Sequence, residues 1–312
     1  MKYMMKKSAI LLFFLALGAV TAFAQDGKEF IGTWDLVIAQ EGKELPSWLE
    51  IKKSGVNTLI GRYVYAFGSA RPIAEVKLAD GKFNFTIPRQ WEPEGQDMDF
   101  EGMKDGEGLK GTMVYTDGKT YKWTAVRAPK LAYVKNPKWG EPIELFNGND
   151  MAGWKVLGEN QWVVEDGILN SPKSGSNLVS EEEFTDFKVH VEFKIPAGSN
   201  SGFYLRGRYE VQITDDLGKD PESLLFGGVY GFLTPNQMAA KPAGEWQEYD
   251  ITLIGRRVTV VANGETIISE QNIPGITGGA LNSKEGEPGP FLIQGDHGAV
   301  AYRKITVTQR VD

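Results

Sequence analysis

The sequence predicts an all-β protein of two domains. Short stretches with alternating apolar and polar residues, such as 82–87 and 188–195, recur along the chain between turns rich in Gly, Asn and Asp. No segment keeps a convincing helical period over about a dozen residues. A length of 312 residues is typical of two domains of ordinary size, and a proline-rich stretch near residue 138 separates them.

The first 24 residues have the features of a signal peptide. The segment begins with basic residues, continues with an apolar run over 9–20 and ends in Ala22-Phe23-Ala24, a small-residue cleavage pattern. The apolar run is shorter than the roughly 20 residues of a membrane-spanning helix, and Gln25 rather than a lipidated Cys follows the predicted cut after Ala24. We therefore expect a periplasmic or secreted protein without a membrane anchor.

Composition excludes several kinds of chemistry. The absence of Cys excludes disulfides, thiol nucleophiles and Cys-ligated zinc or iron–sulfur clusters. Because His190 and His297 are the two histidines of the chain, a His-rich metal site is not expected either. The formal net charge of −7, which becomes more negative when the lysines of the leader are removed, argues against nucleic acid and favours a neutral ligand.

The predicted first domain spans 27–128 and forms a small antiparallel β-barrel or sandwich. Its opening Gly32-Thr-Trp34 resembles the first strand of lipocalin-like barrels, in which the Trp closes one end of the barrel. Four aromatic residues of this domain are candidates for stacking on sugar rings, although such residues more often pack in a core. They are Tyr63, Tyr65, Phe67 and Trp91.

A semi-rigid connector is expected over 129–140. Pro129 and Pro137 lie within this segment, Pro142 follows it, and its residues show little periodicity. The second domain accordingly spans 141–312 and carries further strand patterns.

Two neighbouring strand patterns of the second domain present a polar set of side chains. Side chains alternate across a strand, so Tyr204 and Arg206 share the face opposite to the apolar residues of 203–206. Glu210 and Gln212 alternate with apolar residues in the same way. If the turn between the strands keeps these faces aligned, the four side chains form one surface, either merely solvated or shaped for sugar hydroxyls. We favour the sugar site, because planar donors and acceptors lie beside an aromatic ring.

The two histidines differ in context. His190 lies among charged residues of an amphipathic strand and is expected at the surface. His297 lies between Asp296 and Gly298, where a carboxylate can hold an imidazole at a cleft, or where the histidine simply stabilises a turn. The local context alone leaves both interpretations open.

Further candidates belong to loops. Lys241 either overhangs the sheet or is an ordinary surface lysine, and Trp246, at the start of the following strand, either packs or stacks on a sugar. Glu210 and Asp215 are candidate ligands of a divalent cation such as Ca²⁺, which prefers carboxylate oxygens. No spaced metal motif accompanies them, so no cofactor is certain.

Several separated motifs of the second domain resemble one family. They are, in order, Leu145-Phe-Asn-Gly148 with Gly153-Trp154, Asn200-Ser-Gly-Phe-Tyr-Leu-Arg-Gly207, Tyr209-Glu-Val-Gln-Ile213, Gly228-Val-Tyr-Gly231, Lys241-Pro-Ala-Gly-Glu-Trp246, Gln294-Gly-Asp-His-Gly298 and Tyr302-Arg-Lys-Ile305. Over about 141–309 the chain resembles the 3-keto-disaccharide hydrolase family, which implies a concanavalin-like or laminin-G-like β-jelly-roll sandwich. The resemblance also implies that 294–297 lines the active cleft, which is why we favour the cleft for His297. It implies in addition that the substrate is a small glycoside or disaccharide oxidised to a ketone at C3.

The implied ketone predicts cleavage by elimination. It acidifies the hydrogen on C2, and loss of that proton allows the leaving group to depart from C1, after which water adds. We assign proton transfer to His297 or Glu210, and stabilisation of the keto oxygen to Lys241, Arg206 or a bound cation. Substrate binding is assigned to Tyr204, Arg206, Gln212, Trp246, Gln294 and Asp296.

Two other functions stay open. One is an ordinary jelly-roll glycoside hydrolase that uses Glu210 with an Asp partner, and the other is a non-catalytic carbohydrate-binding protein. The same fold serves glycosidases and lectins, so the fold does not choose among them.

Overall fold

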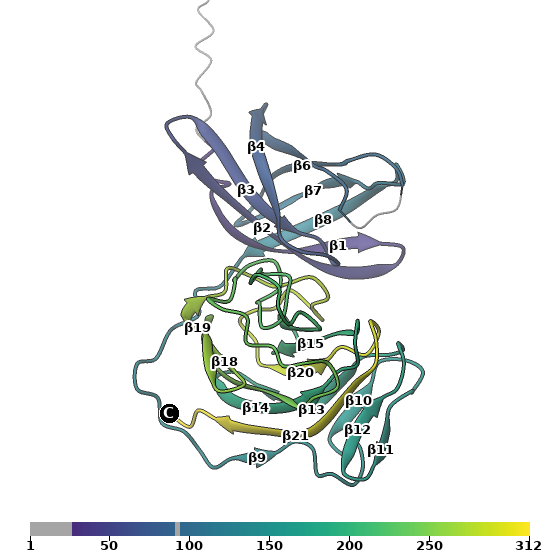
Figure 1. Ribbon diagram of the computed structural model, residues 1–312. Helices are drawn as coiled ribbons and strands as arrows, with labels where there is room; N and C mark the ends of the chain where they lie inside the picture. Colours follow the sequence, from purple (N-terminus) through teal and green to yellow (C-terminus); the bar gives the residue numbers. More distant parts are fainter. Residues whose placement is uncertain (1–26, 91–93) are drawn as a thin grey trace, which may run out of the picture.

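The computed structural model describes residues 27–90 and 94–312, and within these ranges it contains 21 β-strands and no helix. The signal peptide predicted over 1–24 lies outside the described residues. Figure 1 shows two bodies, a barrel built from β1 to β8 and a two-layered sandwich built from β9 to β21. The prediction of an all-β fold is confirmed. A helix of the length and hydropathy needed to cross a bilayer is absent from the described ranges.

The first eight strands form a closed antiparallel barrel. Each strand pairs with the next along the chain, and β1 also pairs with β8, so that no strand edge is left open. The sequence left barrel and sandwich as alternatives for this region, and the structure has the barrel. Its strands are β1 (Gly32–Gln40), β2 (Lys43–Ser54), β3 (Thr58–Val64), β4 (Arg71–Ala79), β5 (Lys82–Ile87), β6 (Met98–Asp105), β7 (Gly108–Val114) and β8 (Thr120–Arg127).

The alternation that predicted these strands fills the interior of the barrel. In β5, Phe83, Phe85 and Ile87 are buried, while Asn84 and Thr86 are exposed. The rings of Phe83 and Phe85 are parallel, with centroids 6.2 Å apart. A small barrel is stabilised by filling its interior with such apolar side chains.

Trp34 of the opening motif is fully buried in the barrel. Its indole Nε1 donates a hydrogen bond of 2.8 Å to the carbonyl oxygen of Phe30, and the guanidinium carbon of Arg127 lies 3.9 Å from the ring centroid. The Gly32-Thr-Trp34 motif therefore begins the first strand and places a buried indole under the guanidinium of Arg127.

The second body is a sandwich of two antiparallel sheets. One has the strand order β10-β13-β20-β15-β16, and the other has the order β11-β12-β21-β14-β17-β18-β19, with β9 paired to β21. Strands from distant parts of the sequence lie side by side, because β20 separates β13 from β15 and β21 separates β12 from β14. Such crossovers are typical of a jelly roll. The strands are β9 (Ile143–Glu144), β10 (Trp154–Val156), β11 (Val163–Glu165), β12 (Ile168–Ser171), β13 (Leu178–Phe184), β14 (Phe187–Lys194), β15 (Asn200–Leu205), β16 (Tyr209–Thr214), β17 (Gln247–Ile254), β18 (Arg257–Ala262), β19 (Glu265–Asn272), β20 (Gly289–Ile293) and β21 (Val300–Gln309).

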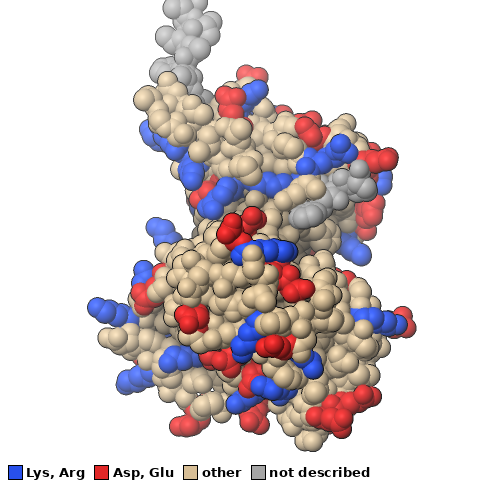
Figure 2. Space-filling model, viewed as in Figure 1, with Lys and Arg blue, Asp and Glu red and all other residues tan. Residues whose placement is uncertain are grey.

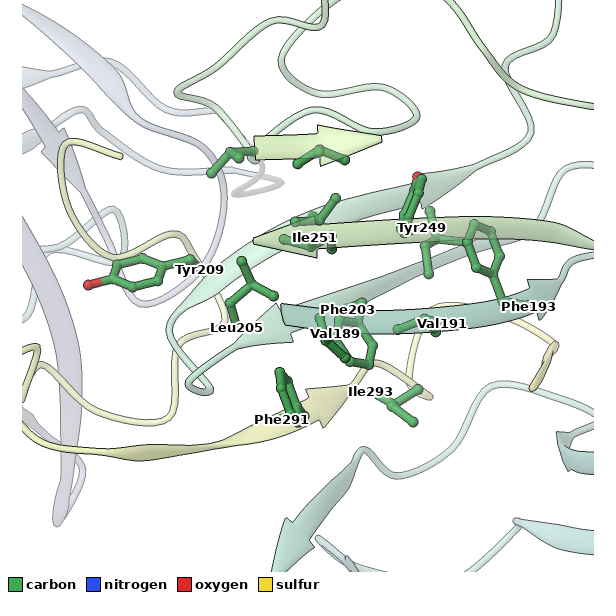
Figure 3. Close-up of a cluster of buried hydrophobic side chains, with 14 of the residues drawn as sticks. Val189, Val191, Phe193, Phe203, Leu205, Tyr209, Tyr249, Ile251, Phe291 and Ile293 are labelled. Carbon is green, nitrogen blue, oxygen red and sulfur yellow. The ribbon is translucent and has the colours of Figure 1, made fainter. Parts of the chain in front are cut away.

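The core of the sandwich lies between the two sheets (Figure 3). Val191 and Phe193 of β14 face Phe203 of β15 and Phe291 of β20, and all four side chains are fully buried. The ring centroids of Phe203 and Phe291 are 5.2 Å apart. Because one face of β15 packs in this core, the alternate residues of β15 point to the outer side of the five-stranded sheet.

The barrel packs directly against loops of the sandwich. Trp48 of β2 is fully buried and belongs to the hydrophobic cluster of the sandwich, with its ring 5.3 Å from that of Phe232. The backbone N–H of Gly279 donates a hydrogen bond of 2.8 Å to the carbonyl oxygen of Ala66, in the loop between β3 and β4. The two bodies therefore share both apolar and polar buried contacts.

Candidate active site

A small polar cavity lies on the outer side of the five-stranded sheet. Its volume is about 170 Å³, and side chains from β15 and β16 line it together with four loops of the sandwich and one loop of the barrel. The lining residues are Phe67, Gly68, Asn177, Asn200, Tyr204, Glu210, Gln212, Tyr230, Gly278, Gly279, Gln294, Asp296 and His297. Six of the residues predicted for the site lie here: Tyr204, Glu210, Gln212, Gln294, Asp296 and His297.

The pairing of β15 with β16 explains how three of these side chains meet. Tyr204 lies directly opposite Glu210, and Gly202 lies opposite Gln212. Directly opposite residues of an antiparallel pair project to the same face, so alternation brings Tyr204, Glu210 and Gln212 to one side while the apolar residues between them face the core.

Gly202 leaves the space in which the side chain of Glu210 lies. A Cβ atom on Gly202 would be 2.2 Å from Oε1 of Glu210 and 2.9 Å from the carboxyl carbon. The backbone of Gly202 is not in the left-handed region, so the need for glycine here is one of space and not of backbone conformation. The absence of a side chain on β15 therefore sets the position of the carboxyl group.

Burial changes the acidity of Glu210. The residue is only 3% exposed, and this burial raises the pKa of the carboxyl to about 8 because the charged form loses its hydration. The hydroxyl of Tyr204 and the imidazole of His297 oppose the rise, while the negative charge of Asp296 adds to it. A carboxyl group with this pKa exchanges a proton near neutral pH, as a general acid or base must.

Two acceptors at the cavity lack a protein donor. Oδ1 of Asn200 and Oε1 of Gln294 are buried, and no donor among the described residues reaches either atom. A buried acceptor without a partner costs about 1–3 kcal/mol, so these two atoms are suited to accept hydrogen bonds from a bound ligand. Both residues line the same cavity as Glu210.

His297 and Asp296 form an interacting pair at the same cavity. Nδ1 of His297 lies 2.6 Å from Oδ1 of Asp296, and both side chains are about half exposed. The hydrogen bond to Asp296 raises the pKa of His297, so the protonated imidazole is favoured. This is the carboxylate-held imidazole that the sequence suggested, and it stands in the more exposed part of the lining while Glu210 is buried.

Tyr230 lines the cavity and was not predicted as a site residue. Its backbone N–H donates a hydrogen bond of 3.0 Å to the carbonyl oxygen of Glu210, which fixes the loop beside β16. Burial, with a contribution from the charge of Glu210, raises the pKa of the Tyr230 phenol to about 12. The phenol therefore stays neutral and can donate a hydrogen bond.

Arg206 lies away from the cavity, contrary to the alternation argument. β15 ends at Leu205, and Arg206 adopts a left-handed backbone with φ of 53° in the turn that follows. Its guanidinium donates a hydrogen bond to the carbonyl oxygen of Gly255 and lies 5.2 Å from the ring centroid of Tyr209. Alternation holds only within a strand, so Arg206, one of the four predicted side chains, lies in the turn instead.

Lys241 and Trp246 also lie outside the cavity lining. Nζ of Lys241 donates to the carbonyl oxygen of Trp246 at 3.2 Å, so the lysine turns back on its own loop. The ring of Trp246 lies 4.6 Å from the guanidinium carbon of Arg303 and 4.9 Å from Nζ of Lys194, next to the other sheet. Neither residue lies where it could contact a ligand in this cavity.

The two candidate cation ligands do not converge. Glu210 lies within β16 and lines the cavity, whereas Asp215 follows the end of that strand and accepts a hydrogen bond of 3.1 Å from the N–H of Gly198. In residues 27–90 and 94–312, no group of three or more His, Asp or Glu side chains is arranged to hold a metal ion. His190 pairs with Asp250 at 2.8 Å and is remote from the cavity lining.

Of the aromatic residues of the barrel that were candidates for sugar stacking, some lie in the core and one lies at the cavity. Tyr63 and Tyr65 are buried in its core, whereas Phe67 is 63% exposed and lines the cavity. Trp91 lies outside the described residues.

Apart from two glycines, Gly278 and Gly279, three lining residues of the sandwich were not predicted. Asn200 and Tyr230 stand within motifs that carried the family resemblance, so their positions in those motifs were a usable signal. Asn177 gave no such signal, because a single Asn before a strand is common in turns.

A larger cavity of about 500 Å³ lies between the barrel and residues 281–287. It includes Asp35, whose burial raises the pKa of its carboxyl to about 7 against the opposing charges of Arg256 and Arg208. None of the predicted site residues lines this cavity. The smaller cavity brings the predicted residues together, and it is the candidate active site.

The fold and the cavity together define a jelly-roll protein with a small polar cleft on one sheet. Residues 141–308, more than half of the chain, match the family described as 3-keto-alpha-glucoside-1,2-lyase-like domains, and the chain belongs to that family. The predicted family is thereby confirmed.

Among curated proteins, a 3-keto-disaccharide hydrolase of Bacteroides thetaiotaomicron (strain ATCC 29148) is 25% identical, with 40% of this chain and 57% of the relative covered. The chain thus spans little more than half the length of that relative. Two solved structures of Parabacteroides distasonis ATCC 8503 proteins, proposed to be glycosyl hydrolases, are also similar. One is 28% identical with a TM-score of 0.47, covering 55% of this chain and 84% of the other. The second is 21% identical with a TM-score of 0.44, covering 55% and 94%.

Proposed function

We propose that the protein is an enzyme that cleaves glycosides carrying a ketone at C3. The observation that carries this proposal is the buried carboxyl of Glu210, whose pKa of about 8 suits proton transfer, in a cavity with two unpartnered acceptors. The family description and the name of the Bacteroides relative support the substrate class. On the face shown in Figure 2, acidic and basic side chains are interspersed, which suits a neutral ligand.

The reaction begins at C2 of the oxidised sugar. The carboxylate of Glu210 takes the proton from C2, and the electron pair of that bond forms an enolate with the oxygen at C3. When the ketone re-forms, a double bond forms between C1 and C2, and the bond from C1 to the leaving oxygen breaks. Water then adds across C1 and C2 and returns the 3-keto sugar, so no pair of catalytic carboxylates at fixed spacing is required.

His297 serves as the acid in this scheme. Two groups at the cavity can transfer protons, and their environments differ. Glu210 is buried, whereas His297 is about half exposed and its protonated form is favoured by Asp296. Protonated His297 gives its proton to the leaving oxygen as the bond to C1 breaks.

Neutral donors stabilise the enolate oxygen. We no longer assign this role to Lys241 or Arg206, because their cationic groups bond to carbonyl oxygens outside the cavity. The phenol of Tyr230 lines the cavity as a neutral donor and takes their place. Gln212, Gln294 and the phenol of Tyr204 bind sugar hydroxyls, and a bound divalent cation is the alternative stabiliser.

One experiment tests the proposal. The protein is incubated in D₂O with a disaccharide oxidised at C3 and, separately, with the unoxidised parent, each with and without a chelator, and the products are followed by NMR. We expect cleavage of the keto substrate alone, with deuterium at C2 of the product and none in enzyme-free controls. Loss of cleavage in chelator, with recovery on adding Ca²⁺, would assign the enolate charge to a cation instead of Tyr230.

An ordinary glycoside hydrolase is the second candidate, because a second carboxyl group, Asp296, lines the cavity with Glu210. A classical mechanism uses such a pair on an unoxidised glycoside. Asp296 is already bonded to His297, which favours the first candidate. Cleavage of the unoxidised parent in the same experiment would reverse this order, and binding without any cleavage would indicate a carbohydrate-binding protein.

We also propose that the protein is exported, on the basis of the leader sequence over 1–24. Fractionation of producing cells, followed by mass spectrometry of the N-terminus, tests this. A mature chain that begins at Gln25 in the periplasm or medium is expected, and a full-length chain confined to the cytoplasm would contradict export.

A further inference from the structure

The loop between β3 and β4 is held firmly against the sandwich, beside the candidate active site. Ala66 accepts a hydrogen bond of 2.8 Å from the N–H of Gly279, as described above. The contact is close enough that a Cβ atom on Gly278 would lie 2.1 Å from the carbonyl oxygen of Gly68. Ser69 in the same loop accepts a hydrogen bond of 2.6 Å from the side-chain amide of Gln90. The loop is therefore tied to both bodies.

This loop presents a large apolar side chain at the cavity. Phe67 is 63% exposed, although it lines a cavity otherwise bounded mainly by polar groups. The ring of Tyr65 lies 6.1 Å from that of Phe67 in an edge-on arrangement, which supports it from the barrel side. Phe67 thus offers a supported aromatic face to whatever occupies the mouth of the cavity.

The depth of the cavity orients a substrate. Glu210 is 3% exposed, whereas Asp296 and His297 in the same lining are about half exposed and Phe67 is 63% exposed. The cavity volume of about 170 Å³ is small beside the roughly 300–1,000 Å³ of pockets that enclose drug-sized ligands. The sugar whose C2 hydrogen reaches Glu210 must lie inside, so the leaving group must project toward the mouth, where Phe67 stands.

We propose that Phe67 forms a leaving-group subsite, so that the barrel selects among substrates by the face that the leaving group presents. This inference rests on the proposed function, because it assumes that the reacting sugar lies against Glu210. An aromatic ring packs on the apolar face of a pyranose or on an aryl ring, and it has little to contact in a methyl group. The subsite therefore favours 3-keto disaccharides and aryl 3-keto-glucosides over methyl 3-keto-glucoside.

Steady-state kinetics on the three substrates test this selection. For Phe67→Ala we expect KM to rise roughly two- to tenfold for the disaccharide and the aryl glucoside, the effect of losing one aromatic contact, with kcat little changed. For methyl 3-keto-glucoside, both constants should match the unmodified protein. Phe67→Trp should restore the disaccharide KM. Val56→Ala removes an 83% exposed apolar side chain elsewhere on the barrel and should change none of the constants.

Two outcomes would overturn the subsite. One is an equal change on all three substrates, which would indicate a general effect on the cavity, and the other is no change on any. If the unmodified protein cleaves no keto substrate, the proposed function fails by itself. NMR titration with the oxidised disaccharide and with the oxidised monosaccharide then decides the inference, since Phe67→Ala should weaken binding of the disaccharide alone.

Discussion

At the scale of single residues, the candidate site depends on the burial of one carboxyl group. Glu210 is enclosed by the sheet, and burial moves its pKa to about 8, into the range in which proton transfer is efficient. Asp296 is the other carboxyl group in the cavity lining, but it is about half exposed and bonded to His297. In the proposed mechanism Glu210 is therefore the better base.

Replacement of Glu210 tests its role directly. Glu210→Gln keeps the size of the side chain and removes the proton acceptor, so kcat on a 3-keto disaccharide should fall by about 10²–10⁴-fold, the usual contribution of a general base. Binding of the same substrate, measured by NMR titration, should persist. Glu181→Gln at an exposed position is the matched control and should keep full activity. Activity retained in Glu210→Gln would remove this residue from the mechanism.

The dependence of rate on pH is a second prediction. Because the base form is the ionised carboxylate and its pKa is raised to about 8, the ionised fraction grows as pH rises through 8. We therefore expect a bell-shaped dependence of kcat/KM on pH in buffers of equal ionic strength, with an ascending limb as Glu210 ionises and a descending limb as His297 loses the proton that it gives to the leaving oxygen. An ascending limb with its midpoint near 4.5, the ordinary value for Glu, would contradict a base whose pKa is raised by burial.

At the scale of elements, the pairing of β15 with β16 shows what the sequence could and could not predict. Tyr204, Glu210 and Gln212 were grouped correctly because period-two alternation is a local property. Arg206 was grouped with them wrongly, since the end of a strand at Leu205 depends on the backbone of the turn.

The remaining parts of the site required long-range information. Gln294 and His297 reach the cavity because β20 pairs with β15, and residues so far apart in sequence give no local sign of such pairing. Their placement came from the family resemblance. For the same reason Asn177 was missed, and Phe67, although a predicted stacking candidate, could not be placed at this cavity, since their proximity arises only in the folded sandwich and its contact with the barrel. The all-β class needed only the local alternation.

Gly202 offers a prediction that belongs to the strand. A methyl group at this position would lie 2.2 Å from Oε1 of Glu210 and must displace that carboxyl. A shift of about 1 Å in a catalytic group can lower the rate roughly 100-fold. We therefore expect kcat of Gly202→Ala to fall by about 10–100-fold. Gly286→Ala is the control, because a Cβ atom there makes only ordinary contacts at 3.5 Å. Equal activity in the two variants would argue that the carboxyl position is unimportant.

At the scale of the whole molecule, the hydrophobic cluster of the sandwich includes Trp48 and Val64 of the barrel, which also has a core of its own. Trp48 belongs to the barrel by sequence and to the sandwich by packing, and a Cβ atom on Gly275 would lie 2.2 Å from its indole nitrogen. Such close packing across the junction couples the two bodies energetically.

Trp48→Ala should therefore destabilise both bodies together. The loss of a fully buried Trp costs roughly 3–5 kcal/mol. In thermal denaturation followed by circular dichroism, we expect one transition in the unmodified protein and one transition at lower temperature in the variant. Val56→Ala, at an exposed position of the same barrel, should leave the midpoint unchanged. Two separate transitions, of which only one shifts, would show that the bodies unfold independently.

The attachment of the β3–β4 loop to the cavity has a consequence for divergence. The proton-transferring residues and the aromatic residue at the mouth are encoded in separate segments of the gene, and loops tolerate exchange better than the strands that they connect. Under the proposed function, substitutions confined to residues 65–70 would change which glycosides are accepted without disturbing the position of Glu210. Relatives that combine the same sandwich with a different barrel loop would keep the reaction and differ in substrate specificity.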